Sequence, residues 1–168
     1  MTQKTSTDLR DRTFDDLVEG ESLTALHISV TPDHINSFQD FLGHTDPKHS
    51  ENPWLMGNNL HIDEDFSKKN MYGGIVGDGN QTAQYLCQIL TDSLPWGSLV
   101  SGYSKLDIKF TNPTRPGDEV VVTGNITQKY TESDRDYVVC DVIAKKNRDT
   151  VIAVGNIRAY VPRRTSAS

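Results

Sequence analysis

The stretch YSKLDIKFTNPTRPGDEVVVTGNI, residues 103–126, contains the strongest structural signal in this 168-residue chain. It begins with KLDIKF, in which Leu106, Ile108 and Phe110 alternate with polar residues, as expected of a half-buried strand. A turn with two prolines and a glycine follows, TNPTRPGD, and then the β-branched run EVVVTGNITQKY. The stretch therefore predicts two strands and the connection between them.

Two further β-branched runs, DYVVCDVIAKK and TVIAVGNIRAYV, follow the short turns TESDR and NRD. Everything beyond Gly97 thus predicts an antiparallel meander. Such a sheet needs a cover for one face. The preceding segment GNQTAQYLCQIL predicts a helix that can supply it, because one stripe contains Ala83, Leu86, Cys87, Ile89 and Leu90.

The first third of the chain predicts a shorter helix and a long loop. In TPDHINSFQDFLG, Thr31 can cap a helix, Pro32 suits its first position and Gly43 ends it. Residues 43–60 contain two prolines, two glycines and four Asn or Asp residues, which predicts a loop. Residues 1–12 are expected to be disordered and residues 163–168 to form a flexible tail, leaving a single domain over 13–162.

The composition of the chain argues against nucleic-acid binding and against a membrane-spanning segment. The formal net charge is -6, and binding to nucleic acid relies instead on clustered Lys and Arg. No apolar run approaches the ~20 residues that cross a bilayer, and no basic and apolar leader begins the chain. We therefore expect a cytoplasmic protein with neither a nucleic acid nor a membrane as partner. Cys87 and Cys140 are expected to be buried, inert thiols in a reducing compartment.

Taken in order, these segments resemble the MaoC-like branch of the hotdog-fold superfamily, the R-specific enoyl-CoA hydratases and dehydratases. Members carry a strand ending in an aromatic residue, then Pro, then Arg-Pro-Gly-Asp; here these are Phe110, Pro113 and residues 115–118. The segments TFDDLVEGESL and ISVTPDHINSF are similar to the family's N-terminal part. The resemblance implies an α+β fold in which an antiparallel β-sheet wraps around one long central α-helix.

The resemblance also implies a lyase that acts on acyl thioesters bound to CoA or acyl carrier protein, of hydratase or dehydratase type, in a biosynthetic pathway. Hydratases of the family use Asp and His in the pattern Asp-x-Asn-Pro-x-His-x-Asp, ahead of a hinge ending in His-Gly. Asn58, His61 and Asp63 match the Asn, the His and the last Asp. The resemblance therefore implies a catalytic His61, with Asn58 and Asp63 near the substrate.

This sequence departs from the family pattern at three positions, and one of them is the catalytic Asp. Met56 stands at the catalytic Asp and Asn59 at the Pro. The hinge MYGGIVGDG, residues 71–79, places Asp78 where the histidine belongs. We therefore expect an altered catalytic pair, in which Asp78 or an acid of the preceding loop partners His61.

A second register, HTDPKH, puts His44 at the Asp position and keeps Asp46 and His49 as substrate-binding candidates. It requires about a dozen extra residues before the hinge, so the His61 register is preferred. The same string could ligate zinc with His61 or Asp63, but it contains a proline and lies on no regular element. We expect neither a metal nor a cofactor.

Hydration of an enoyl thioester needs a base for water, an acid for the α-carbon and donors for the enolate oxygen. His61 could be the base, or could only orient its loop. Asp78 could be a relocated acid, or the cap of the helix that follows. Gly77 and Gly79 could let the backbone approach the thioester carbonyl, or could only form a tight turn.

Other activities remain open on the same scaffold. Hotdog thioesterases place a carboxylate on or near the central helix, and a double-bond isomerase or a cyclase would need only a proton shuttle and an oxyanion hole. A non-catalytic acyl-binding subunit is the remaining alternative, since Met56 replaces the usual Asp. A non-catalytic subunit could also complete a heterodimer with a chain that carries the intact pair. Otherwise a homodimer or higher homo-oligomer is expected, because the KLDIKF strand or its neighbour would leave an open edge.

Overall fold

The computed structural model describes residues 12–45 and 59–162. In these residues, one five-stranded antiparallel sheet has the order β1-β3-β4-β5-β2. The strands are β1 Leu26–Ser29, β2 Lys105–Phe110, β3 Glu119–Glu132, β4 Arg135–Lys146 and β5 Thr150–Val161. The helices are the short 3-10 helix η2 Phe14–Asp16, α1 Pro32–Phe41, α2 Glu64–Lys69 and α3 Gly79–Ser93.

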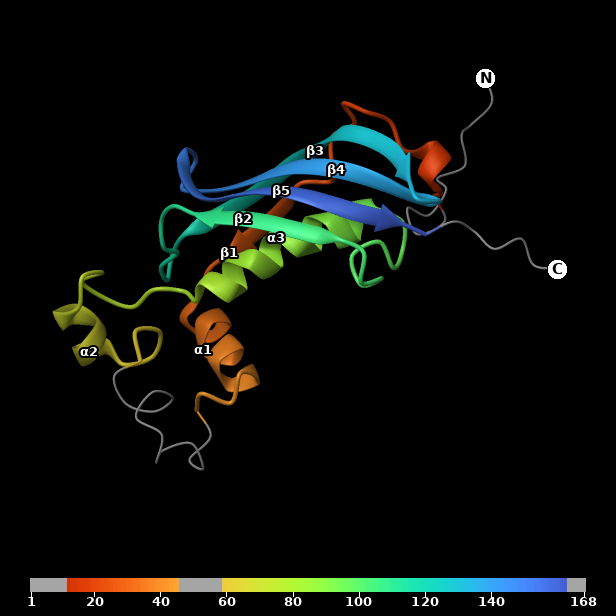
Figure 1. Ribbon diagram of the computed structural model, residues 1–168. Helices are drawn as coiled ribbons and strands as arrows, with labels where there is room; N and C mark the ends of the chain where they lie inside the picture. Colours follow the sequence, from red (N-terminus) through yellow and green to blue (C-terminus); the bar gives the residue numbers. More distant parts are fainter. Residues whose placement is uncertain (1–11, 46–58, 163–168) are drawn as a thin grey trace, which may run out of the picture.

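Helix α3 runs along one face of the sheet, as Figure 1 shows, and contacts strands β1, β3, β4 and β5. Leu86, Ile89 and Leu90 of the predicted stripe are completely buried. Ala83 and Cys87 are only half-buried. Instead, the first turns of α3 bury Gln81, Thr82 and Tyr85. The side chains of Gln81 and Tyr85 lie against His34 of α1, so the polar start of α3 faces another helix rather than the sheet.

The sheet contributes its half of the core through alternating side chains. Along β4, Val138, Cys140, Val142 and Ala144 all face inward and are at most 3% exposed. Strands β3, β4 and β5 form the predicted meander. Strand β2 does not pair with β3 as the meander prediction required; it pairs with β5 at the far edge. The two prolines of the connection 111–118 break the chain direction, and this connection carries it across the end of the sheet.

Helices α1 and α2 lie beyond the N-terminal end of α3, away from the sheet (Figure 1). As predicted, Thr31 caps α1, its hydroxyl accepting from the His34 amide at 3.1 Å, and Gly43 follows the helix with φ +74. Helix α2 was not expected, because six residues are too few to show a hydrophobic period. Within the described ranges, none of the helices is long and apolar enough to cross a membrane.

Candidate active site

A cavity of about 480 Å³ opens at the N-terminal end of α3. Its walls come from the segment before α2, from the hinge (residues 71–79), from the first turn of α3, and from the end of β2 with the residues that follow it, 110–113. Much of this lining is apolar, through Leu60, Val76, Phe110 and Pro113. The lining also includes the imidazole side chain of His61. An apolar cavity with a few polar groups is the usual form of a small-molecule site.

The His61 ring is held by its own chain. Its Nδ1 lies 2.7 Å from the carbonyl oxygen of Val76, and its backbone amide donates to Oδ1 of Asn59 at 2.8 Å. Because a carbonyl oxygen only accepts, Nδ1 must carry a hydrogen. Nε2 is therefore the nitrogen left to exchange protons.

Asp78 partners that second nitrogen. Its Oδ2 lies 3.6 Å from Nε2 of His61, and its Oδ1 accepts from the Asn80 amide at 2.8 Å. The carboxylate is therefore both the N-cap of α3, as predicted, and the neighbour of His61 within the same chain. Asp78 is 8% exposed and is not among the described residues that line the cavity. Its contact with Nε2 therefore lies just outside the described lining of the cavity.

The two glycines flanking Asp78 have different surroundings. The amide of Gly77 donates to the carbonyl oxygen of Thr114 at 2.9 Å, so it is not free to bind a substrate oxygen. A Cβ on Gly77 would lie only 2.2 Å from Oγ1 of Thr114, which explains the glycine. Both glycines line the cavity. At Gly79, the place that a Cβ would take has no neighbouring atom within 4 Å, so Gly79 has open space beside it that Gly77 lacks.

The Arg-Pro-Gly-Asp turn supports the hinge. The guanidinium of Arg115 donates to the carbonyl oxygens of Tyr72 and, at 3.4 Å, of Ile75. Through these contacts, the turn before β3 fixes the loop that carries one wall of the cavity. The family-like motif at residues 115–118 therefore has a structural role next to the site.

Asp118 closes the same turn. It accepts hydrogen bonds from the Arg115 amide at 2.7 Å, from Lys146 at 2.9 Å and from Asn147 at 2.6 Å. Burial acts to raise the pKa of Asp118, but the hydrogen bonds from Lys146, Asn147 and Arg115, with the charge of Lys146, lower it below its ordinary value. The turn is thus tied to the end of β4.

The remaining predicted residues divide into two groups. Asp63 caps α2, its Oδ1 accepting from the Phe66 amide at 2.9 Å, and the described cavity lining does not include it. Asn58, Asp46 and His49 lie outside the described residues. His44 contacts Gln39, a residue that was not predicted because a lone glutamine on a helix carries no sequence signal. Residues 12–45 and 59–162 contain no cluster of three His, Cys, Asp or Glu that could hold a metal ion.

Neither cysteine lines the described cavity. Cys140 is completely buried in β4, as expected, and Cys87 is half-buried. Burial raises the pKa of the Cys87 thiol, and burial together with the charge of Asp141 raises the pKa of Cys140 to about 12. Both thiols are therefore protonated at neutral pH.

No protein-family model and no curated protein sequence matches this chain. Solved structures do match. A monoamine oxidase regulatory protein from Archaeoglobus fulgius is similar with a TM-score of 0.69 and 18% identity, over 92% of this chain and 96% of that one. A MaoC-like dehydratase from Rhodospirillum rubrum is similar with a TM-score of 0.65 and 24% identity, over 92% of this chain and 99% of that one. An (R)-hydratase from A. caviae involved in PHA biosynthesis is similar with a TM-score of 0.65 and 17% identity, over 88% of this chain and 98% of that one.

These identities are low, and the likeness shows the fold. The chain has the hotdog fold of the MaoC-like dehydratases and R-hydratases, in the α+β class that the resemblance implied. The cavity lined by His61 lies at the N-terminal end of the central helix of that fold.

Proposed function

We propose that this protein is a hydratase or dehydratase of acyl thioesters carried by CoA or by acyl carrier protein. The observation that carries the proposal is the pair of His61 and Asp78 at the start of α3. The imidazole lines an apolar cavity, and a carboxylate oxygen of Asp78 lies 3.6 Å from its Nε2. The hotdog fold, shared with named hydratases and dehydratases, supports the same reaction class.

In the proposed reaction, Nε2 of His61 removes a proton from a water molecule as the water oxygen attacks the β-carbon of the enoyl thioester. Electrons move to the thioester carbonyl, and the amide of Gly79 donates to the resulting enolate oxygen. The imidazolium then returns a proton to the α-carbon, so that atoms and charge balance. Asp78 stabilises the imidazolium through its negative charge. Dehydration follows the same steps in reverse.

The position of Asp78 bears on the alternative reactions. A thioesterase of the carboxylate type needs its acid in contact with the thioester carbonyl or with the attacking water. Asp78 instead is only 8% exposed, is not among the described residues that line the cavity, and already accepts from Asn80 and Gln39 through its two oxygens. This arrangement favours a carboxylate that acts through the histidine, and so favours hydration over hydrolysis.

The direct test is product analysis with the whole chain. Crotonyl and 3-hydroxybutyryl thioesters are incubated with the protein while the absorbance of the conjugated enoyl group and the release of free thiol are followed. Interconversion of the two thioesters without free thiol is expected. Thiol release as the main product would replace the proposal with a thioesterase, and no conversion of either substrate would favour a binding subunit.

We also propose that two copies of the chain form a homodimer through β2. Leu106 and Phe110 pair in register with the core residues Ile157 and Ala153, so they lie on the α3 side of the sheet. Even so, they are 41% and 50% exposed, at an edge with free backbone groups. A second copy of this edge would cover both the side chains and the backbone.

A further inference from the structure

Gln39 is completely buried where α1 meets the start of α3, and both ends of its amide have partners. Its Nε2 donates to Oδ2 of Asp78 at 3.3 Å. Its Oε1 lies 2.7 Å from Nδ1 of His44 and 3.2 Å from Nδ2 of Asn59. The same carboxylate oxygen of Asp78 therefore faces Gln39 on one side and His61 on the other.

The partners fix which way the Gln39 amide points. The Asn59 side chain accepts the backbone N–H of His61 through Oδ1, so its other end is the NH₂ group and requires an acceptor. That acceptor is Oε1 of Gln39. The NH₂ group of Gln39 is therefore turned toward Asp78, where it meets a carboxylate oxygen.

His44 adds to the same orientation. Because its Nδ1 faces an amide oxygen, this nitrogen carries the hydrogen whether or not the ring is charged. His44 lies shortly before residues 46–58 and Asn59 directly after them. The Oε1 atom of Gln39 is thus within hydrogen-bond distance of one residue before residues 46–58, His44, and of one residue after them, Asn59.

We propose that Gln39 is a positioning residue, which holds the Asp78 carboxylate toward Nε2 of His61 and is itself oriented by Asn59 and His44. Its catalytic consequence rests on the proposed function. Without the Gln39 donor, the imidazole would be the one partner left to Oδ2 of Asp78 among residues 12–45 and 59–162, and rotation of the carboxylate would move its charge relative to His61. In the described residues, the titratable groups in contact with this network are Asp78, His61 and His44.

The test uses two substitutions of Gln39 in the whole chain. Gln39→Met keeps the length of the side chain and removes the donor. Gln39→Glu keeps the shape and places a second negative charge beside Asp78. Asn36→Met and Asn36→Glu, on the exposed face of α1, are matched controls. The readouts are kcat and KM of hydration over a range of pH, and an NMR titration of the His61 ring.

In Gln39→Met, kcat is expected to fall about 10- to 100-fold with KM little changed, because positioning is lost while the cavity wall remains. In Gln39→Glu, the midpoint of the His61 titration is expected to rise by about one pH unit more than in Asn36→Glu, because a nearby negative charge favours the imidazolium. The pH profile of kcat should move in the same direction.

The two readouts separate this proposal from the proposed function. If the wild-type protein hydrates no thioester, the proposed function fails, while a shifted His61 titration in Gln39→Glu still supports the positioning role. If the His61 titration is the same in Gln39→Glu as in Asn36→Glu, the positioning role is overturned whatever the activity. If Gln39→Met does not fold, Gln39→Glu alone decides through the same titration.

Discussion

Nδ1 of His61 lies 2.7 Å from the carbonyl oxygen of Val76, and this contact leaves Nε2 as the nitrogen that faces Asp78. Replacing His61 with Gln is expected to lower kcat for hydration about 10²- to 10⁴-fold, since a general base contributes that much. The free energy of unfolding should fall by only about 1 kcal/mol, the usual cost of one hydrogen bond. Steady-state kinetics and denaturant unfolding measure the two effects. The control is His27→Gln, at an exposed position of β1; equal activity in both variants would remove His61 from the reaction.

Gly77→Ala should disturb the hinge. The new Cβ would lie 2.2 Å from Oγ1 of Thr114, which is closer than real Cβ contacts come. Either the hinge or the segment after β2 that carries Thr114 must therefore move. Overpacking of this kind costs about 1 to 3 kcal/mol. Thermal unfolding measures the loss. Adding Thr114→Ala should recover part of it, because the clashing oxygen is removed. Gly79→Ala has no neighbour within 4 Å at the Cβ position and should leave stability unchanged; a loss equal to that of Gly77→Ala would contradict the steric explanation.

The Asp118 contribution to stability should depend on pH. Hydrogen bonds from Lys146, Asn147 and Arg115 lower its folded-state pKa despite the opposing effect of burial. The stabilisation is therefore complete above the ordinary value of 3.8 and is lost as the pH falls through the lowered folded value. Asp118→Asn should cost about 2 kcal/mol near neutral pH, since hydrogen bonds to a charged group are lost.

Urea unfolding of the wild-type protein and of Asp118→Asn at several pH values measures this effect. The difference between them should shrink toward pH 3. Asp107→Asn, at an exposed position of β2, serves as the control for removing a surface carboxylate. A difference that stays constant over this range would show that the charge of Asp118 does not stabilise the turn.

Cys140 should be unreactive in the folded protein. It is completely buried, and its pKa is raised to about 12, so the thiolate that reacts with disulfide reagents is almost absent. In a Cys87→Ser variant, which leaves Cys140 alone, labelling by an aromatic disulfide is expected only after unfolding in denaturant. Rapid labelling of that variant without denaturant would contradict the burial of β4.

Leu106→Glu should separate the proposed dimer. Leu106 is 41% exposed in the single chain, so a charge there should cost little stability by itself. In an edge-to-edge dimer the same charge would be buried without a partner. Sedimentation should show dimers for the wild-type protein and for His27→Glu on the opposite edge strand, and monomers for Leu106→Glu. A wild-type monomer that is fully active would argue against the assembly.

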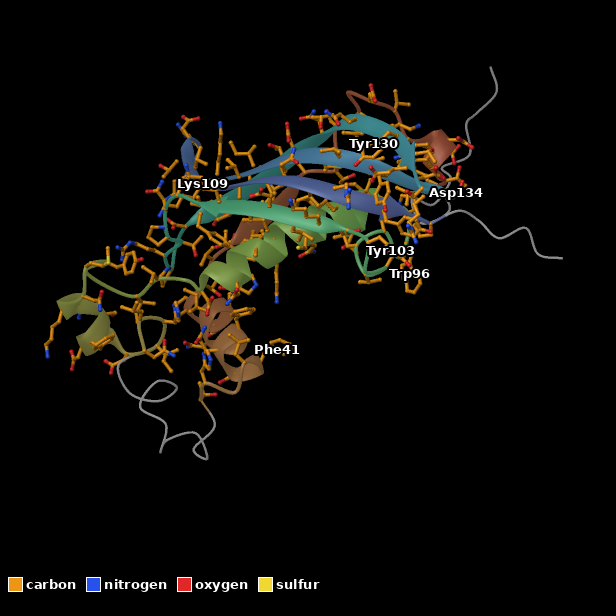
Figure 2. All side chains as sticks on the ribbon, viewed as in Figure 1. Phe41, Trp96, Tyr103, Lys109, Tyr130 and Asp134 are labelled. Atoms are coloured by element: carbon orange, nitrogen blue, oxygen red, sulfur yellow. The ribbon has the colours of Figure 1, made fainter. Side chains whose placement is uncertain are left out.

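Two exposed aromatic side chains, Trp96 and Tyr103, mark another region of the surface. Trp96 is 77% and Tyr103 is 47% exposed, and Figure 2 shows both at the end of the sheet away from α1 and α2. They lie in the connection between α3 and β2, far from the cavity wall formed by the hinge. They are therefore suitable fluorescent or chemical probes that should not disturb the proposed site.

Patterns that repeat within one element were predictable. The alternation in KLDIKF and the stripe of Leu86, Ile89 and Leu90 led to the correct strand and helix, and the identity of Asp78 led to the correct cap. The partner of β2 was not predictable, because register with β5 depends on which residues meet across the sheet. Gln39 gave no signal either. Its role depends on His44, Asn59 and Asp78, which only the folded chain brings together.

The anchoring of the hinge by Arg115 has a consequence for the order in which the chain is made. Arg115 bonds carbonyl groups 43 and 40 residues earlier, and Gly77 bonds Thr114. Translation therefore completes His61 and Asp78 well before the residues that hold their loop in place. A nascent chain that ends near residue 100 contains Gln39, His61 and Asp78 but lacks four of the five strands. Because distant contacts form late, we expect the proposed site to form only after the C-terminal half has left the ribosome and folded.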